Sequence, residues 1–206
     1  MSWEDYIPDD IKDLYEVHDF KHAAAILSVE FPEEFGEICN ALRKFRFKKS
    51  DIIAAGGNES RIPKIFSDIL RPMEWKEKNL GAELKVFEIK GKSSILKRSI
   101  NHGSHLVDYL KGRVAFDLER NSKDQTFDRD LFAFRAFFEY DAISVGVLVT
   151  RSNEIDPFFK KFGINTKYGA STTHMGKLIP RLQAGRNGGC PVLVFGITTK
   201  LMIDNE

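Results

Sequence analysis

Two continuous apolar runs constrain the fold of this chain most strongly. Residues 143–149 read ISVGVLV and residues 191–197 read PVLVFGI, without a regular alternation of polar and apolar side chains. Strands of this kind are buried on both faces, as in a sheet that helices cover on both sides. Helices and strands alternate through the second half of the chain. The sequence therefore predicts an α/β fold with a central mixed β-sheet flanked by helices on both faces.

The spacing of apolar residues and the capping residues predict four helices. In the clearest, residues 127–140, Phe127, Leu131, Phe134 and Phe138 recur at helical spacing. The other three are expected from Asp9 to about Phe20, from Pro32 to about Lys49, and from Asn58 or Ser60 to about Pro72. Residues 84–89 alternate and predict a further strand.

Composition is that of an ordinary globular protein. The 206 residues fit a single domain, with a helical N-terminal part at about 1–50 and a core at about 51–206. The 17 Phe residues indicate a core built on aromatic packing. Cys39 and Cys190 are far apart and have no metal-ligand spacing. Since the first residues lack an apolar signal core and no run is long enough to cross a membrane, we expect a cytoplasmic protein.

Three acidic residues carry the most informative pattern. The segments 106–110 and 113–119 are predicted as two strand pieces joined by Lys111-Gly112. They hold Asp108, then Asp117 nine residues later, and Glu119 two residues after that. The two-residue period of a strand places Asp117 and Glu119 on the same face. Carboxylates that converge in this way suit Mg²⁺, which prefers oxygen ligands, and phosphodiester hydrolysis uses such an ion to activate water.

These residues resemble a known family. Residues 111–119 (KGRVAFDLE), with Asp108 before them, resemble the active-site strand of type II restriction endonucleases of the BglII, BstYI and BamHI group. This group belongs to the PD-(D/E)xK nuclease superfamily. Three more segments match in the right order: residues 66–70 with 75–77, residues 143–149, and residues 190–197. The resemblance covers roughly residues 55 to 200, and it implies Mg²⁺-dependent cleavage of both strands of duplex DNA at a short palindromic site.

The motif departs from the superfamily pattern at two positions. Glu119 stands where the superfamily usually has Lys, as in the BamHI branch, and its role as base, orienting group or ligand stays open. Val107 stands where Pro is usual. The group also has a polar side chain on the upstream helix near the metal. Asn58, Glu59 and Ser60 are the candidates here, with Glu59 favoured. A role in stabilising or capping the helix N-terminus would explain an acid at this position equally well.

The resemblance also implies a homodimer, because a two-fold symmetric protein matches a two-fold symmetric DNA site. The polar, Gly-rich stretch from about Gly163 to Gly189 is long enough to be functional. Arg and Lys suit guanine edges and Asn suits adenine. The predicted DNA-contacting residues are Asn165, Lys167, Ser171, Thr172, Thr173, His174, Lys177, Arg181, Arg186 and Asn187.

Three alternatives to this prediction remain. One is a repair or junction nuclease of the same superfamily that acts without sequence preference, and another is a DNA-binding module without catalysis. A plain structural protein is the third. The net charge of +1 does not discriminate between them, since a positive face can be local. The spacing of His102, His105 and His174 fits no histidine-metal nuclease pattern.

Overall fold

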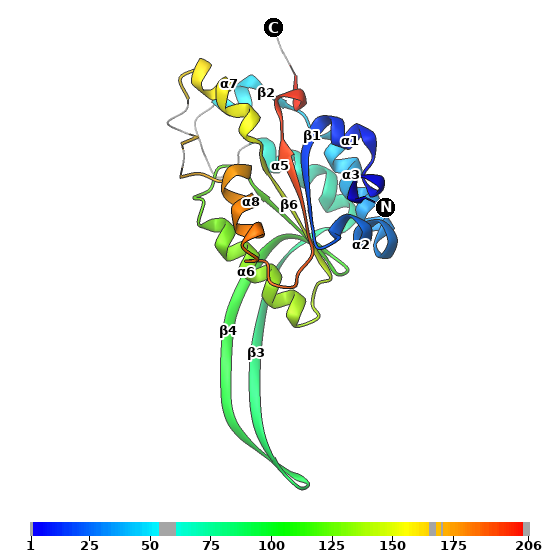
Figure 1. Cartoon of the computed structure of the whole chain (residues 1–206), viewed down its shortest axis with the longest axis vertical. Coiled ribbons are helices and arrows are strands. Elements are labelled where there is room, and N and C mark those ends of the chain that lie inside the picture. The colour runs from blue at the N-terminus through cyan, green and yellow to red at the C-terminus, as the bar shows by residue number, and fades with distance from the viewer. Residues whose placement is uncertain (1, 54–60, 165–167, 170, 204–206) are drawn as a thin grey trace.

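The computed structural model describes residues 2–53, 61–164, 168–169 and 171–203. Its centre is a six-stranded mixed sheet in the order β1-β7-β6-β5-β4-β3 (Figure 1). β5, β6 and β7 are parallel to one another, and the other neighbours are antiparallel. The strands are β1 (Tyr15–Phe20), β3 (Lys76–Lys90), β4 (Ser93–Lys111), β5 (Val114–Glu119), β6 (Val145–Arg151) and β7 (Val192–Ile197), with a separate parallel pair of β2 (Phe47–Lys48) and β8 (Met202–Ile203).

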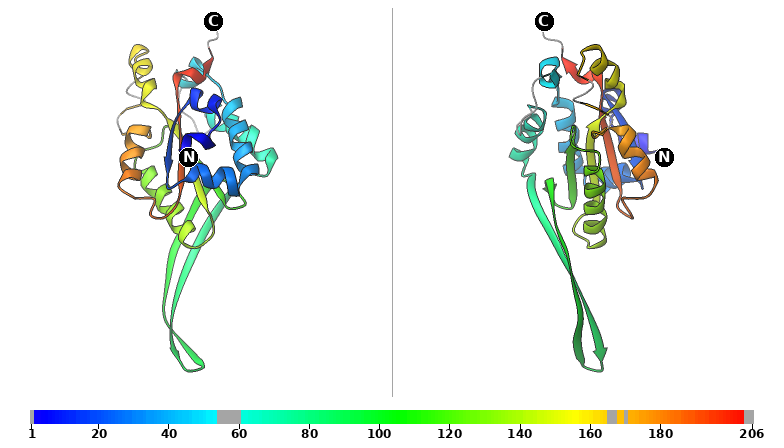
Figure 2. Two further views of the ribbon diagram at one scale, coloured as in Figure 1. Left: turned by 45° about the vertical axis from the view of Figure 1, so that its right-hand side comes forward. Right: turned by 90° about the vertical axis from the view of Figure 1, so that its left-hand side faces the viewer.

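Helices cover both faces of this sheet, which confirms the predicted fold class (Figure 2). One hydrophobic core joins the sheet to α1, α2, α3, α5 and α7, and a second joins the other face to α6 and α8. The α-helices are α1 (Asp9–Leu14), α2 (Ala23–Glu30), α3 (Pro32–Lys44), α4 (Lys49–Ile53), α5 (Arg61–Leu70), α6 (Thr126–Glu139), α7 (Asp156–Lys161) and α8 (Met175–Gln183). Short 3-10 segments are η1 (Trp3–Tyr6), η2 (Arg71–Met73), η3 (Asn153–Ile155) and η4 (Thr199–Leu201).

The two apolar runs form neighbouring central strands, β6 and β7. Val147 and Val149 belong to the first core, whereas Leu148 between them belongs to the second. Every residue of both strands is buried. The absence of alternation in the sequence is thus explained by burial on both faces.

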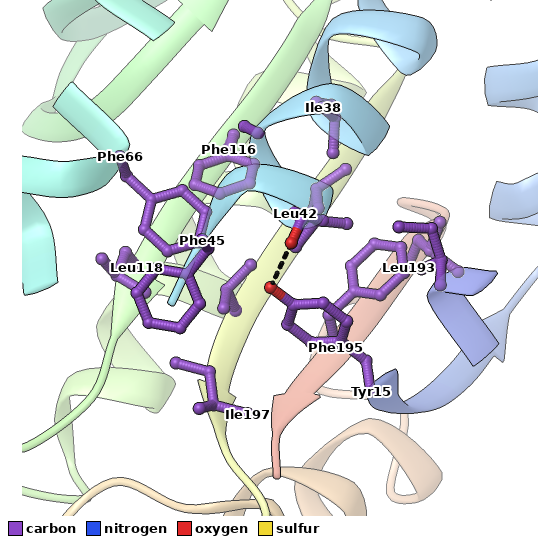
Figure 3. Close-up of a cluster of buried hydrophobic side chains, with 14 of the residues drawn as sticks. Tyr15, Ile38, Leu42, Phe45, Phe66, Phe116, Leu118, Leu193, Phe195 and Ile197 are labelled. Carbon is purple, nitrogen blue, oxygen red and sulfur yellow. Dashed lines mark hydrogen bonds between the residues drawn. The ribbon is translucent and has the colours of Figure 1, made fainter. Parts of the chain in front are cut away.

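Aromatic side chains pack strand β5 against the helices that cover the first-core face of the sheet (Figure 3). The rings of Phe66 on α5 and Phe45 stack with their centroids 4.8 Å apart, and Phe66 lies 5.7 Å from Phe116 on β5. The Tyr15 hydroxyl donates a hydrogen bond of 2.9 Å to the Leu42 carbonyl, which ties β1 to α3. The prediction of an aromatic core is therefore borne out on this face of the sheet.

The N-terminal region differs from the predicted pair of long helices. The first helix ends at Leu14, and β1 follows it as an edge strand that pairs antiparallel with β7. The second helix ends at Lys44 rather than near Lys49. Pairing with β7 explains β1: tertiary hydrogen bonds override the weak helical propensity of this short segment.

Strands β3 and β4 form a two-stranded arm that projects far from the body of the molecule (Figure 1). Only residues 84–89 and 106–110 of this arm were predicted as strand, because exposed residues in it do not follow a one-sided apolar pattern. Near the body the arm packs on α6, where the rings of His105 and Phe132 lie 5.4 Å apart. Farther out, apolar side chains such as Phe87 and Ile89 are exposed.

Helix α8 lies inside the stretch from Gly163 to Gly189 that the sequence analysis treated as loop. Met175, Leu178 and Leu182 face the second core from one side of this helix. The helix therefore shortens the irregular part of the predicted DNA-contacting stretch. Within the described ranges, no helix has the length and apolar character needed to cross a membrane.

Candidate active site

The three predicted acids lie together on β4 and β5. The antiparallel register pairs Tyr109 with Phe116, so Asp108 and Asp117 occupy adjacent positions on neighbouring strands. The backbone N–H of Asp108 donates to Asp117 Oδ1 at 2.7 Å, and the N–H of Leu118 donates to Asp108 Oδ2 at 3.2 Å. These reciprocal hydrogen bonds fix both carboxylates to the backbone of the opposite strand.

Asp117 and Glu119 share one face of β5, as the strand period predicted. Phe116 and Leu118 point into the first core, so the two acids point toward the side covered by α6. Asp117 is 4% exposed and Glu119 is 8% exposed. Burial of carboxylates to this degree is costly unless positive charge or hydrogen-bond donors compensate for it.

A fourth acid, Asp130, enters this cluster from α6. Asp130 is 3% exposed, and its Oδ1 accepts hydrogen bonds from Arg129 Nε at 3.0 Å and Nη2 at 2.9 Å. Arg129 Nη2 also lies 3.6 Å from Glu119 Oε1. Asp130 was not among the predicted site residues. Its spacing carries the signal, because it lies three residues after Phe127 and four before Phe134, on the buried side of α6.

The four carboxylates raise one another's proton affinity. Burial, and then the charges of Asp108 and Asp130, raise the pKa of Asp117 well above its ordinary value. Burial and the Asp130 charge raise the pKa of Glu119 to about 7. Burial also raises the pKa of Asp130 to about 6, although Arg129 acts in the opposite direction. The cluster therefore carries more negative charge than Arg129 neutralises.

The chemistry of the donor set fits a divalent cation. No hydrogen-bond donor reaches the buried Glu119 Oε2 or Asp130 Oδ2 within the part of the chain that the structure describes. The same ranges hold no group of three His, Cys, Asp or Glu side chains already placed around a common point. Mg²⁺ does not require such a cage, because it commonly takes one or two carboxylates and completes its shell with water and substrate phosphate. Asp108 and Asp117 supply those carboxylates.

The raised pKa values of these carboxylates predict how the free energy of unfolding depends on pH in the absence of metal. The folded-state pKa values of Glu119 and Asp130 lie above their ordinary values, so folding favours the protonated forms. In EDTA, the free energy of unfolding is therefore expected to fall as pH rises from about 4 to about 7, by up to a few kcal/mol. Thermal unfolding at pH 4.5 and pH 7.5 measures this, with Asp130→Asn as the control that flattens the dependence. Equal slopes in wild type and variant would contradict the assignment of strain to this cluster.

The upstream helix contributes polar groups other than the predicted one. Glu59, with Asn58 and Ser60, lies outside the described residues. Ser67 on α5 is hydrogen-bonded to the Tyr109 hydroxyl at 2.8 Å, and the Arg71 guanidinium lies 4.7 Å from the centroid of the Tyr109 ring. Tyr109 follows Asp108 directly. Burial raises the pKa of Asp108, and the Arg71 charge opposes part of this rise. These groups border the acidic cluster and were not predicted.

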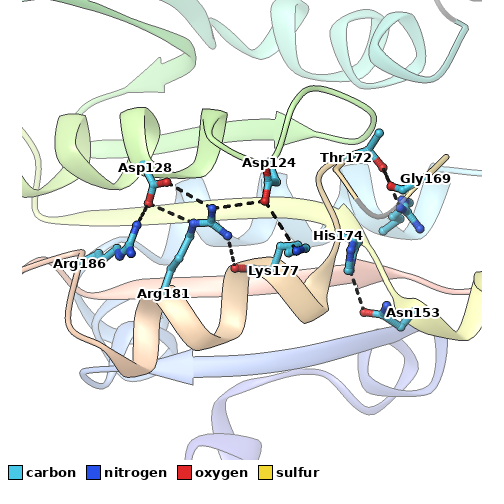
Figure 4. A network of polar contacts seen from close by, with 10 residues as sticks. Asp124, Asp128, Asn153, Gly169, Thr172, His174, Lys177, Arg181 and Arg186 are labelled. Carbon is cyan, nitrogen blue, oxygen red and sulfur yellow. Dashed lines mark hydrogen bonds and ion pairs between the residues drawn. The ribbon is translucent and has the colours of Figure 1, made fainter. Parts of the chain in front are cut away.

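The predicted DNA-contacting residues 171–174 lie beside the loop that follows β5 (Figure 4). Lys167 and Asn165 lie outside the described residues. Residues 171–173 run antiparallel to residues 122–124, with Asp124 N donating to the Ser171 carbonyl at 2.9 Å. Thr173 is buried and its hydroxyl oxygen accepts from Ser122 N, whereas Ser171 is exposed and His174 is half-buried. The segment is thereby attached to the residues that connect β5 to α6.

The predicted basic residues on α8 and just after it pair with Asp124 and Asp128, which lie just before α6 and in its first turn (Figure 4). Arg181 Nε donates to Asp128 Oδ1 at 3.0 Å, and Arg186 pairs with the same carboxylate. Lys177 Nζ lies 3.9 Å from Asp124. Because Lys177 and Arg186 are substantially exposed, these ion pairs are weak and can exchange for phosphate contacts.

Asn187, also predicted to contact DNA, lies in the interior of the protein rather than on its surface. Its side chain is fully buried, and its amide donates a hydrogen bond of 2.7 Å to the Cys190 carbonyl. This contact closes the turn between α8 and β7. Asn187 therefore stabilises the backbone that carries the exposed basic residues.

Two comparisons with known proteins bear on this site. The family model of restriction endonucleases BglII/BglIII matches residues 15–197, which include β4, β5, α6 and α8. A comparison with curated proteins returned no match. The matched region extends from β1 to the last residue of β7 and so contains the whole six-stranded sheet.

Proposed function

This chain belongs to the restriction endonuclease BglII/BglIII family, whose members are phosphodiester hydrolases that cleave specific DNA sites, and we propose here which of its residues perform the cleavage. Asp108, Asp117 and Glu119 form the catalytic centre, and Mg²⁺ is the cofactor. The observation that supports this most strongly is the convergence of these carboxylates on two hydrogen-bonded strands, with too little positive charge to balance them.

Asp108 and Asp117 would hold the cation. Both present carboxylate oxygens, the ligand type that Mg²⁺ prefers, and both are fixed by backbone N–H donors. When bound, the ion supplies positive charge for the phosphate oxygens and lowers the pKa of water. The two aspartates therefore determine where the scissile phosphate is positioned relative to β5.

Glu119 accepts the proton of the attacking water in this mechanism. It lies two residues beyond Asp117 on the same face, and no donor among the described residues occupies its Oε2. The raised pKa of Glu119, about 7, is close to the pH at which a general base works best. Arg129 contacts Glu119 and Asp130 together, so it orients the base and offsets part of the cluster's negative charge.

Residues beside this centre that are exposed or half-buried are proposed to contact DNA. Ser171, Thr172 and His174 lie next to the loop after β5. Lys177 and Arg181 on α8, and Arg186 after it, extend the same surface. Lys167 is proposed with them, and Thr173 and Asn187 are proposed to act by shaping the backbone. A Lys or Arg that contacts phosphate contributes affinity that falls as salt concentration rises.

We further propose that two copies act together on a palindromic site, each cutting one strand. A two-fold symmetric dimer presents the same residues to both half-sites. Sedimentation velocity with and without a DNA duplex measures this stoichiometry. A single chain that makes double-strand breaks while it remains monomeric on DNA would contradict it.

Removal of the metal tests the mechanism. We expect wild-type enzyme to cut phage and plasmid DNA into discrete fragments in Mg²⁺, and to lose all cleavage in EDTA, because the cation supplies the charge on the phosphate and the activated water. Mn²⁺ is expected to restore cleavage after EDTA treatment. Gel electrophoresis of the digests gives the result, and sequencing the ends identifies the site. Undiminished cleavage in EDTA would exclude the metal, and a smear in place of bands would indicate cleavage without sequence preference.

A further inference from the structure

A cavity of about 270 Å³ lies at the carboxyl end of β6, apart from the acidic cluster. Its lining includes two cations, one carboxylate and three rings: Arg151, Lys160, Asp156, Phe159, Tyr168 and His174. Neither the catalytic mechanism nor the DNA contacts of α8 explain why an arginine is buried at this place.

Arg151 is the central group of the cavity wall. It is only 3% exposed, although arginine is almost never buried without charged or polar partners. Its Nη1 donates to Asp156 at 2.7 Å, and its Nη2 donates to the Tyr168 carbonyl at 3.1 Å and to Thr172 Oγ1 at 2.9 Å. Its buried Nε has no hydrogen-bond partner within the part of the chain that the structure describes. Among the described residues, the Nε–H of Arg151 is therefore an unpaired hydrogen-bond donor at a site from which bulk water is largely excluded.

The guanidinium is held in a rigid setting. The rings of Phe159 and Tyr168 stack with centroids 4.3 Å apart, and Arg151 Cζ lies 5.3 Å from the Phe159 centroid. Thr172 accepts from Arg151 and donates to the Gly169 carbonyl at 2.8 Å (Figure 4). An arginine fixed in this way loses little entropy when a ligand binds, as in sites that recognise planar or tetrahedral oxyanions.

The cavity lies at the same edge of the sheet as the catalytic acids but on the opposite face. Glu119 pairs with Thr150 in the parallel register, so Arg151 lies one residue farther along the next strand. Strand alternation puts Arg151 with Val149 and Val147, on the face of the first core. The acids and the cavity therefore lie at the same end of the parallel strands, on opposite faces of the sheet.

Positive charge exceeds negative charge around the cavity. Asp156 offsets one cation, whereas Lys160 is exposed beside Arg151. Arg120, directly after Glu119, donates to the Tyr168 hydroxyl at 2.9 Å. Burial, and to a lesser extent the neighbouring Arg151 charge, lower the pKa of Arg120. An oxyanion bound here would relieve the repulsion between these cations.

We propose that this cavity binds a phosphate group through Arg151 and Lys160, with His174 at its rim. The phosphate belongs either to the DNA backbone outside the scissile position or to a small phosphorylated molecule. The first source rests on the proposed function, since it requires DNA at the carboxyl edge of the sheet. Binding of phosphate itself does not depend on cleavage.

Lys160→Ala is the variant that tests this site, with Lys161→Ala as its matched control. Both lysines are exposed on α7, but Lys161 is not part of the cavity lining. Substitution of Arg151 alone is less informative, because it also releases the loop at Tyr168 and Thr172. Two readouts are needed: the affinity for inorganic phosphate by titration calorimetry, and the salt dependence of duplex DNA binding in EDTA by fluorescence anisotropy.

We expect Lys160→Ala to weaken phosphate binding about three- to tenfold, while Lys161→Ala leaves it unchanged. If the DNA backbone is the source, the slope of log affinity against log salt also becomes shallower by about 0.9 in Lys160→Ala only. An altered phosphate affinity with an unaltered slope assigns the cavity to a small phosphorylated molecule. Equal phosphate affinity and equal slopes in both variants would overturn the proposal. A wild-type enzyme that does not cleave DNA would contradict the proposed function without affecting the phosphate titration.

Discussion

Replacement of Asp117 by alanine is expected to lower the rate of DNA cleavage by about a thousandfold or more and to leave duplex binding intact. The carboxylate lies at the centre of the cluster and contacts the backbone of the strand that carries Asp108. In the proposed mechanism its loss removes a cation ligand, whereas the basic residues proposed to contact DNA are unchanged. Asp117→Asn is the shape-matched variant, because it keeps an acceptor for the Asp108 N–H but not the charge.

Single-turnover cleavage and anisotropy binding, both with the same duplex, separate the two effects. Asp9→Ala is the control, since this acid is almost fully exposed on α1 and lies outside the site. We expect it to cleave at the wild-type rate. An Asp117→Asn enzyme that cleaves within about tenfold of wild type would show that the charge of Asp117 is not required. Parallel losses of binding and cleavage would instead indicate a damaged fold.

Replacement of Phe66 by alanine is expected to destabilise the protein by about 3–5 kcal/mol. The Phe66 ring is fully buried between Phe45 and Phe116, and its removal leaves a cavity that helix α5 and strand β5 cannot close. For a chain of this length the melting temperature should fall by roughly 10 °C. At low temperature the folded fraction should still cleave DNA, because Phe66 lies on the face of β5 opposite the acids.

Calorimetry or chemical denaturation measures this loss, with Phe132→Ala as the control. Phe132 is 47% exposed on α6, so its removal should cost much less than that of Phe66. A Phe66→Ala protein as stable as the control would contradict the view that the aromatic cluster holds β5 in place.

The central sheet and the acid pair could be predicted from the sequence because each leaves a local pattern. The runs that became β6 and β7 are apolar without alternation, and α6 shows a clear helical period. The period of two in β5 was enough to place Asp117 and Glu119 together. In each case the local pattern and the tertiary environment favour the same structure.

Elements that depend on distant partners were missed or were predicted only in part. β1 is a strand because β7 offers it an edge, and nothing within residues 15–20 reports that partner. The arm of β3 and β4 is long because the two strands pair with each other in solvent, so neither has a one-sided apolar pattern. Helix α8 was obscured by its polar residues and by Pro180, although three apolar residues follow the helical period.

Asp130 shows the same limit at the site. Its helix was predicted, but an acid near a helix N-terminus is usually explained by the helix dipole. The packing of α6 on the sheet shows that Asp130 points inward, toward Glu119 and Arg129, in agreement with its helical spacing from Phe127 and Phe134. Acidic residues on the apolar side of a predicted helix are therefore better candidates for a site than their frequency at helix starts indicates.

The most direct test of the divalent-cation centre is a titration of Mn²⁺ into metal-free protein, followed by electron paramagnetic resonance, for wild type and Asp117→Ala. This measurement reports the cation itself and does not depend on knowledge of the DNA site. We predict saturable binding to the wild type and an affinity at least about tenfold weaker in Asp117→Ala, with Asp9→Ala unchanged. Equal Mn²⁺ affinity in wild type and Asp117→Ala would contradict the assignment of the acidic cluster as the catalytic metal centre.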